Sequence, residues 1–169
     1  EISETAVFAG RPLSAAWHCS PSPELPHLAL WHAIAVMREW RGDGHIATLV
    51  DAELDPIEAV VFHDATHPDP KARKVLGKRI TQLTRQWSDE EWNTAAERLQ
   101  TRGLLTHSED GEALTDEGVA LDAHIEGRTD VLASSIWRNV SDAEELITSA
   151  RPYVKAVLTA GILPGTKKR

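Results

Sequence analysis

Hydrophobic and polar positions follow a helical period along most of the chain, most clearly in residues 88–103. Ser88 and Glu91 form a capping box that starts a helix, and Gly103 supplies the left-handed residue that stops it. The apolar side chains between them recur three, four and seven residues apart and form one stripe: Trp92, Ala95, Ala96 and Leu99. We therefore predict an amphipathic helix with one buried face.

A hairpin and a further helix are predicted directly after Gly103. Two leucines lead into Asp110 and Gly111, a hairpin turn signal, and two apolar residues follow the turn. Thr115 then caps a helix that is expected to reach about Leu132. Together with a basic helix predicted at residues 71–82, this order of elements indicates a winged helix.

Several helices are predicted before this core. Residues 25–40 are apolar on almost all sides, which is typical of a helix buried centrally or at a subunit contact. Gly42 and Gly44 are expected to end that helix, with Asp43 capping the next one, at residues 45–53. Asp55 and the proline after it start a third helix, which is expected to reach residue 67.

The C-terminal part is predicted to be helical as well. A second capping box at residues 141–144 starts a helix that Pro152 is expected to kink or restart. The predicted fold is mainly α with a small β-hairpin wing, a winged helix-turn-helix with additional N- and C-terminal helices. The 169 residues suit a single domain, with an N-terminal helical part at 1–70, a winged core at 71–118 and dimerisation-type helices at 119–169.

Composition excludes several classes of protein. The single Cys19 cannot form an internal disulfide or a thiolate metal cluster, and it suits a reducing cytoplasm. The longest uncharged stretch near the start, residues 25–37, is too short and too polar to span a bilayer, so no membrane partner is expected. Because Glu1 opens the chain and Met37 is its only methionine, we expect the natural start to lie upstream or to have been trimmed.

Charge is distributed unevenly in this acidic protein. The formal net charge is -8, which is unfavourable for contact with a phosphate backbone. Residues 69–85 nevertheless form a basic island with a single acidic residue, Asp69. The cations of this island are the candidate nucleic-acid contacts: Lys71, Arg73, Lys74, Lys78, Arg79 and Arg85. The alternative interpretation is a solvated charged face without a partner.

Two resemblances follow from these motifs. The pattern ERLxxRGLL, a turn and LTDEG resembles the recognition helix and wing of the multiple antibiotic resistance regulator class, over roughly residues 71–130. Nearly the whole chain resembles an actinobacterial family of uncharacterised helix-turn-helix proteins. Two departures are that many members carry an additional N-terminal region and that segment 66–83 is longer and more basic in this chain. The matching residues are Gly10, Arg11, Pro12, Trp31, Arg38, Gly42, Asp43, His45, Trp87, Asp89 and Trp92. The resemblance implies a fold and no particular reaction.

The outward face of the helix at residues 88–103 can be predicted at 100° per residue. Opposite the apolar stripe lie Glu90, Thr94, Glu97 and Thr101, flanked by Asn93 and Arg98. Carboxylates on this face oppose the electrostatic attraction that supplies most non-specific affinity for DNA. The pattern therefore disfavours insertion of this helix into the major groove. The basic island keeps duplex DNA as a candidate partner.

A polar cluster in apolar context is the candidate ligand pocket. Its members are Trp31, His32, Arg38, Glu39, Asp43 and His45. In the functional interpretation Arg38 binds a carboxylate or phosphate, and His45 acts as donor or base. In the structural interpretation the cluster is a network of ion pairs at a helix corner, with Arg38 paired to Glu39 or Asp43.

His63 and His67 are weak candidates for metal binding. Their four-residue spacing places them on one helical face, with Asp43 or His45 as further ligands. The sequence has neither an HExxH nor a CxxC motif, and Pro68 frays the helix at His67. We therefore predict no metal and no cofactor.

Two functions follow from the sequence. The first is a ligand-responsive winged-helix regulator-like protein, a homodimer with weak or lost DNA binding. The second is a small-molecule-binding protein or an enzyme that uses residues 38–45 on the same scaffold. No Ser, His and Asp arrangement and no glycine-rich phosphate loop decides between them.

Overall fold

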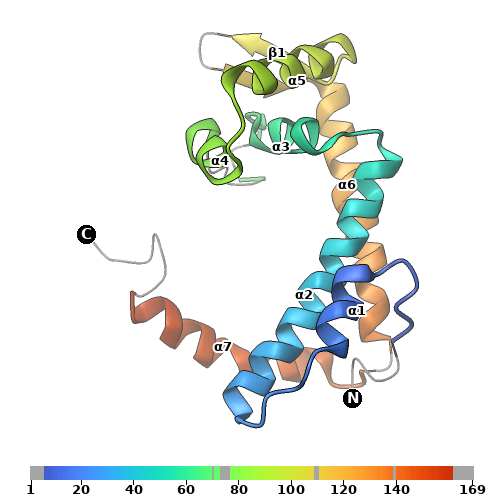
Figure 1. Cartoon of the computed structure of the whole chain (residues 1–169), viewed down its shortest axis with the longest axis vertical. Coiled ribbons are helices and arrows are strands. Elements are labelled where there is room, and N and C mark those ends of the chain that lie inside the picture. Colours follow the sequence, from blue (N-terminus) through green and yellow to red (C-terminus); the bar gives the residue numbers. More distant parts are fainter. Residues whose placement is uncertain (1–5, 70, 73–76, 109–110, 139, 162–169) are drawn as a thin grey trace. The chain divides into compact units, whose positions relative to one another are not determined.

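The structure is a computed structural model that describes residues 6–69, 71–72, 77–108, 111–138 and 140–161 (Figure 1). The chain divides into two compact units, Val7–Ala133 and a second made of Glu1–Ala6 with Ser134–Arg169. The elements are α1 (Pro12–Cys19), α2 (Pro26–Asp51), α3 (Pro56–Asp64), α4 (Lys78–Arg85), α5 (Asp89–Thr101), β1 (Leu105–Ser108), β2 (Gly111–Leu114), α6 (Asp116–Ser134), a 3-10 turn (Ser135–Trp137) and α7 (Ala143–Thr159). The predicted fold class, mainly α with a hairpin wing, is confirmed.

The prediction that Gly42 and Gly44 end a helix is wrong, because α2 continues through both to Asp51. Asp43, predicted to cap a following helix, instead caps α1. Its carboxylate accepts hydrogen bonds from the backbone N–H groups of Leu13 at 3.2 Å and Ser14 at 2.9 Å. These are first-turn amides of α1, which have no partner within their own helix. A long-range cap, rather than a helix boundary, therefore explains this polar residue.

Arg11 explains the small residue at position 44. Its guanidinium donates to the carbonyl oxygens of Trp40 and, at 3.0 Å, of Leu132, and it lies 4.6 Å from the centre of the Trp40 ring. A Cβ at Gly44 would lie 2.6 Å from Nη1 of Arg11. Gly44 therefore allows the arginine to pass close to the α2 backbone.

The winged core is built around α3 and α5, which pack against each other, with the hairpin following α5 (Figure 1). The predicted capping box of Ser88 and Glu91 starts α5, and a further capping box, of Asp55 and Glu58, starts α3. The helix α3 ends at Asp64, earlier than predicted. The core contains the predicted stripe of α5 and residues of its neighbours: Phe62, Val61, Ala65, Trp92, Ala95, Ala96, Leu99, Leu104, Leu105, Leu114 and Ile125.

The hairpin and the start of α6 also follow the prediction. Gly103 adopts φ +73° after α5, and β1 pairs antiparallel with β2 with Leu105 opposite Leu114. Thr66 adds an isolated bridge to Ala113 of β2. The hydroxyl of Thr115 accepts from the backbone N–H of Gly118 at 3.0 Å, which caps α6. The wing is therefore anchored at both ends.

The basic helix is shorter than predicted. Residues 71–72 form a turn, residues 73–76 lie outside the described residues, and α4 begins only at Lys78. Gly77 precedes it with φ +87°, a conformation incompatible with a helix that continues through this position. Gln86 is left-handed at φ +58° and turns the chain from α4 into α5.

The second unit consists mainly of α7. Its predicted capping box is wrong, because Asp142 is the N-cap residue without a side-chain cap, and the hydroxyl of Ser141 donates to the Asp142 carboxylate at 3.0 Å. Pro152 lies inside α7 without dividing it. Among the described residues of α7 none is buried.

Candidate functional site

The exposed face of α5 is acidic, as predicted. Glu90, Thr94 and Glu97 are exposed, as are Asn93 and Thr101, while the apolar stripe is buried. Asp89 and Glu91 add two more exposed carboxylates in the first turn. A hydrogen bond from the Gln82 amide, followed by contacts with Lys78, lowers the pKa of Asp89. Hydrogen bonds from Ser88 lower the pKa of Glu91. Both carboxyl groups are therefore held in the anionic form. Negative charge at the start of α5 interacts favourably with the helix dipole and repels an approaching phosphate.

The arginine within α5 and the one that follows it are already engaged by protein groups. Arg98 pairs with Asp55 and, at 2.7 Å, with Glu58, and these contacts, led by the hydrogen bond to Glu58, raise its pKa. Arg102, which follows α5, donates to the carbonyl oxygens of Ala52 and Glu53 at 2.9 Å. Both guanidinium groups therefore tie α5 to the segment around α3 rather than pointing at a ligand.

The candidate nucleic-acid contacts are only partly described. Lys71, Arg79 and Arg85 are exposed, and the Arg85 guanidinium lies 5.6 Å from the centre of the Trp87 ring. Lys78 lies 3.2 Å from the Asp89 carboxylate and donates to the Asn93 side chain at 3.1 Å. Arg73 and Lys74 lie outside the described residues. The described part of the basic island is thus a short cationic surface directly beside the acidic start of α5.

The candidate ligand pocket does not form a single site. All six residues of the predicted pocket belong to α2, which is continuous, and they lie on different faces of that helix. Trp31 is exposed and packs edge-on against Trp17. The ring of His32 lies 2.8 Å from the hydroxyl of Ser20, while Arg38 pairs with Glu39 at the surface.

The two remaining members of the predicted pocket have separate partners. Asp43 is buried against the start of α1. His45 lies against α3 and α6, where its Nδ1 is 3.0 Å from the hydroxyl of Thr129 on α6. The proposed pairing of Arg38 with Glu39 is therefore present, and the pairing with Asp43 is replaced by contacts of Asp43 with α1.

His45, His63 and Glu126 form one cluster of ligand-type groups. The Nε2 atoms of the two histidines lie 3.1 Å apart, and one ligand atom from each of the three residues lies within 4.8 Å of the others. His67 is not in this group, and its ring accepts from the backbone N–H of Asp69 at 2.9 Å. The predicted pair of His63 and His67 is therefore replaced by His63 with His45.

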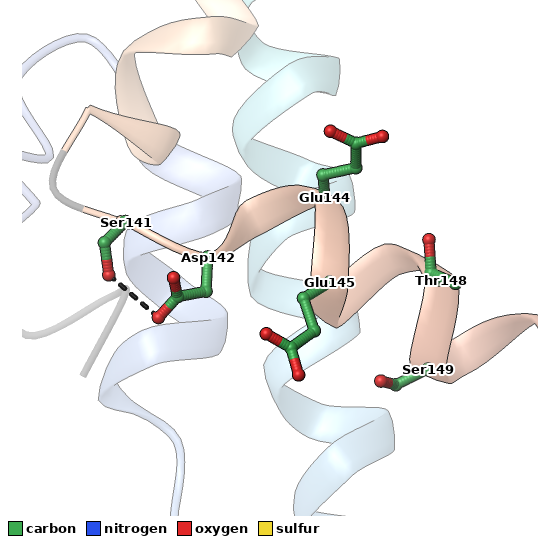
Figure 2. Close-up of a pocket in the computed structure, with 6 residues that line it drawn as sticks. All are labelled: Ser141, Asp142, Glu144, Glu145, Thr148 and Ser149. Atoms are coloured by element: carbon green, nitrogen blue, oxygen red, sulfur yellow. Dashed lines mark hydrogen bonds between the residues drawn. The ribbon is translucent and has the colours of Figure 1, made fainter.

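Two of the surface depressions in the described part of the chain lie at α5 and at α7. One, of about 550 Å³, lies between α3 and α5 and is lined by Glu53, Glu58, Thr94, Glu97, Arg98, Thr101 and Arg102. The other, of about 440 Å³, lies at the start of α7. Figure 2 shows Glu144 and Thr148 pointing to one side of α7, and Glu145 and Ser149 to another. The polar groups of the second depression therefore do not converge on one point.

Sequence reasoning missed Glu126 and Thr129. Both lie on α6, more than 80 positions after His45, and the fold brings them to its ring. The only local signal is their spacing of three residues, which places them on one face of a helix. No spacing rule connects that face to His45.

Comparisons with known proteins match the chain to a family model and to a solved structure. The sequence model of a family described as the helix-turn-helix family matches residues 1–164. A crystal structure of a transcriptional regulator of the MarR family from Rhodococcus sp. RHA1 is similar over 80% of this chain and 97% of that chain, at 14% identity and a TM-score of 0.49. No curated protein matches the sequence. Among the described residues no helix is long and apolar enough to cross a membrane.

Proposed function

Because the chain belongs to the helix-turn-helix family, we propose that it is a winged-helix regulator-like protein whose contact with duplex DNA is weak and independent of sequence. The observation that carries this proposal is the exposed face of α5. That face presents carboxylates, and the arginine within α5 is held by Asp55 and Glu58. In the usual docking of this fold, the second helix of the motif would bring this face to the base edges.

Simple electrostatics supports the proposal. Unit charges about 4 Å apart interact by about 1 kcal/mol in water and by more where water is excluded. Glu90 and Glu97 would each face phosphates or base acceptors at such distances in a major groove, with Asp89 and Glu91 at its edge. Among the described cations of α4, Lys78 already contacts Asp89, which reduces the attraction that it can offer a phosphate. Any residual DNA contact would use Arg79 and Arg85 of α4.

A titration of a labelled random-sequence duplex tests this proposal. At about 0.15 M salt we expect a dissociation constant on the order of 10 µM or weaker, in the range of non-specific binding. Because few phosphates would be contacted, the slope of log K against log salt should be no steeper than about -3. The variant Arg79→Glu/Arg85→Glu should lose binding at low salt.

Arg128→Glu/Arg138→Glu is the matched control, because it makes the same charge change at exposed positions outside α4. Binding by this control should stay within about twofold of the unchanged protein once its effect on net charge is screened by salt. A slope near -8, or equal losses in both variants, would overturn the assignment of residual binding to α4.

Homodimerisation in the cytoplasm belongs to the same proposal. The helix α7 exposes a row of apolar side chains, Leu146, Ile147, Tyr153, Val154, Val157 and Leu158. The first half of α2 exposes Leu28, Leu30, Trp31 and Ile34. Such exposed apolar faces are typical of subunit contacts. Light scattering should therefore give about twice the 18.6 kDa mass of the chain, and a monomer at micromolar concentration would contradict this part of the proposal.

A small-molecule binder or an enzyme remains the second candidate function, and only His45 favours it. Of the six residues of the predicted pocket, His45 is the one that lies beside other ligand-type groups in the described part of the chain. Ligand response in the regulator would use the same place, since the other five residues have separate structural partners or face solvent.

A further inference from the structure

We propose that His45, His63 and Glu126 form a binding site for a divalent transition-metal cation such as Zn²⁺. The three residues come from α2, α3 and α6, and all three are half-buried. Two imidazoles and one carboxylate are a donor set that zinc takes in proteins, with a fourth position left for water or another ligand. This inference does not depend on whether the protein binds DNA.

The distance between the two imidazoles fits a shared metal. With Zn–N bonds of about 2.0–2.1 Å and a tetrahedral angle, two nitrogen ligands lie about 3.3 Å apart. The Nε2 atoms of His45 and His63 are 3.1 Å apart. A cation could therefore sit between the two rings with a displacement of a few tenths of an ångström.

Thr129 fixes the tautomer of His45 that a metal requires. The Thr129 hydroxyl donates to the carbonyl oxygen of Ile125 at 2.7 Å, so its oxygen accepts from Nδ1–H of His45 at 3.0 Å. A proton on Nδ1 leaves the lone pair of Nε2 directed at His63. Thr129 is fully buried, and so this orientation is held by packing as well as by hydrogen bonding.

The charge of the surroundings also suits a cation. The carboxylates of Glu126 and Asp122 lie close enough to His45 to act on its charge, and the Arg41 cation opposes them. Arg41 donates to Oε2 of Glu126 at 2.8 Å and orients the carboxylate. The carboxylate is within 4.8 Å of both histidine nitrogens, a gap that rotation of the flexible Glu126 side chain can close.

A hydrogen bond between two neutral histidines is the competing explanation. In that arrangement Nε2–H of His63 would donate to Nε2 of His45, and the distance of 3.1 Å allows it. Such a bond does not require a carboxylate beside both rings, and it would be displaced when a metal replaces the shared proton. The two explanations differ in whether the cluster takes up a cation.

Zinc titration of the full chain, expressed without a histidine tag and stripped with a chelator, tests the proposal. We expect one zinc per chain with a dissociation constant on the order of 1 µM or tighter. Zinc at a hundredfold excess over that constant should raise Tm by about 5–10 °C. Cobalt should bind with the visible absorption of a tetrahedral site.

The variants separate this site from adventitious histidine binding. His63→Ala and Glu126→Gln should weaken zinc binding, the former by 100-fold or more and the latter by about 10- to 100-fold. Thr129→Val, which leaves all three ligands in place, should also weaken it by about 10- to 100-fold. His67→Ala and His124→Ala are the matched controls, because they remove a histidine close in sequence to a proposed ligand, and they should bind zinc as the unchanged chain does.

Several results would overturn the metal site. These are no uptake of zinc at about 100 µM, equal losses in His67→Ala or His124→Ala and in His63→Ala, or unchanged binding in Glu126→Gln and Thr129→Val together. Far-UV circular dichroism of each variant shows whether it is folded. If His63→Ala unfolds, Glu126→Gln and Thr129→Val decide the outcome, since Glu126 is partly exposed and valine has nearly the shape of threonine.

Discussion

Replacing Arg11 by methionine is expected to lower the free energy of unfolding by about 3–5 kcal/mol. The arginine is only 8% exposed, and its guanidinium holds the carbonyl oxygens of Trp40 and Leu132. Arg11 also lies near the buried Asp43. Burial lowers the pKa of Arg11, and the negative charge of Asp43 opposes this effect. Methionine keeps much of the volume, but it leaves both carbonyl oxygens without this donor and removes the positive charge near Asp43. Urea unfolding followed by circular dichroism measures the loss.

Arg38→Met is the matched control for that change. Arg38 lies on α2, its side chain is 77% exposed, and its partner Glu39 is a neighbour in sequence. Surface ion pairs contribute about 0–1 kcal/mol, so this variant should be nearly neutral. Equal effects of the two substitutions would show that Arg11 does not join α1, α2 and α6 in the way its contacts indicate.

Replacing Gly118 by alanine is expected to lower the free energy of unfolding by about 2–4 kcal/mol. A Cβ at this position would overlap the backbone carbonyl oxygen of Leu104 and lie 3.3 Å from a methyl group of Leu114. Backbone cannot move aside as a flexible side chain can. The first turn of α6 would have to separate from the hairpin, which also disturbs the cap formed by Thr115.

Gly127→Ala is the control, because it makes the same substitution in the same helix. No atom lies within 4 Å of a Cβ built at Gly127, so alanine should raise the free energy of unfolding by about 0.5–1 kcal/mol through helix propensity. Thermal or urea unfolding of both variants should therefore give changes of opposite sign. A stabilised Gly118→Ala variant would mean that the hairpin does not pack on α6 as described.

The parts of the fold that local chemistry determines could be predicted from the sequence. Ser88 and Glu91 act on each other within one turn, and the buried stripe of α5 follows from helical geometry alone. The helix stop at Gly103 and the pairing of β1 with β2 likewise follow local signals, while Asp110 of the predicted turn lies outside the described residues. The acidic outward face of α5 was predictable for the same reason, since it lies opposite the stripe.

Long-range contacts determine what the sequence could not predict. The sequence indicates a helix end at residues 42–44, because glycine and aspartate usually end and start helices. In the structure Asp43 accepts a hydrogen bond from an α1 backbone amide, and Gly44 leaves space for the Arg11 side chain. Both residues therefore lie within a continuous helix. The cluster of His45, His63 and Glu126 joins three helices, and only their packing brings it together.

The ion pairs of Arg98 could not be predicted from local sequence either. Arg98 was predicted only to flank the outward face of α5, whereas it is held by Glu58 and Asp55 of the α3 start, 40 and 43 positions earlier. This pairing strengthens the interpretation of α5 as a structural helix, because the one cation within it is not available to phosphate.

The central claim, that the face of α5 repels duplex DNA, is tested most directly by removing its charge. The variant Glu90→Gln/Glu97→Gln keeps the shape of both exposed side chains, and its affinity for a random duplex is compared with that of the unchanged chain at low salt. Loss of two repulsions of about 1 kcal/mol or less each should raise the affinity about tenfold. Submicromolar binding by the unchanged chain at about 0.15 M salt, with no gain in the variant, would contradict the claim.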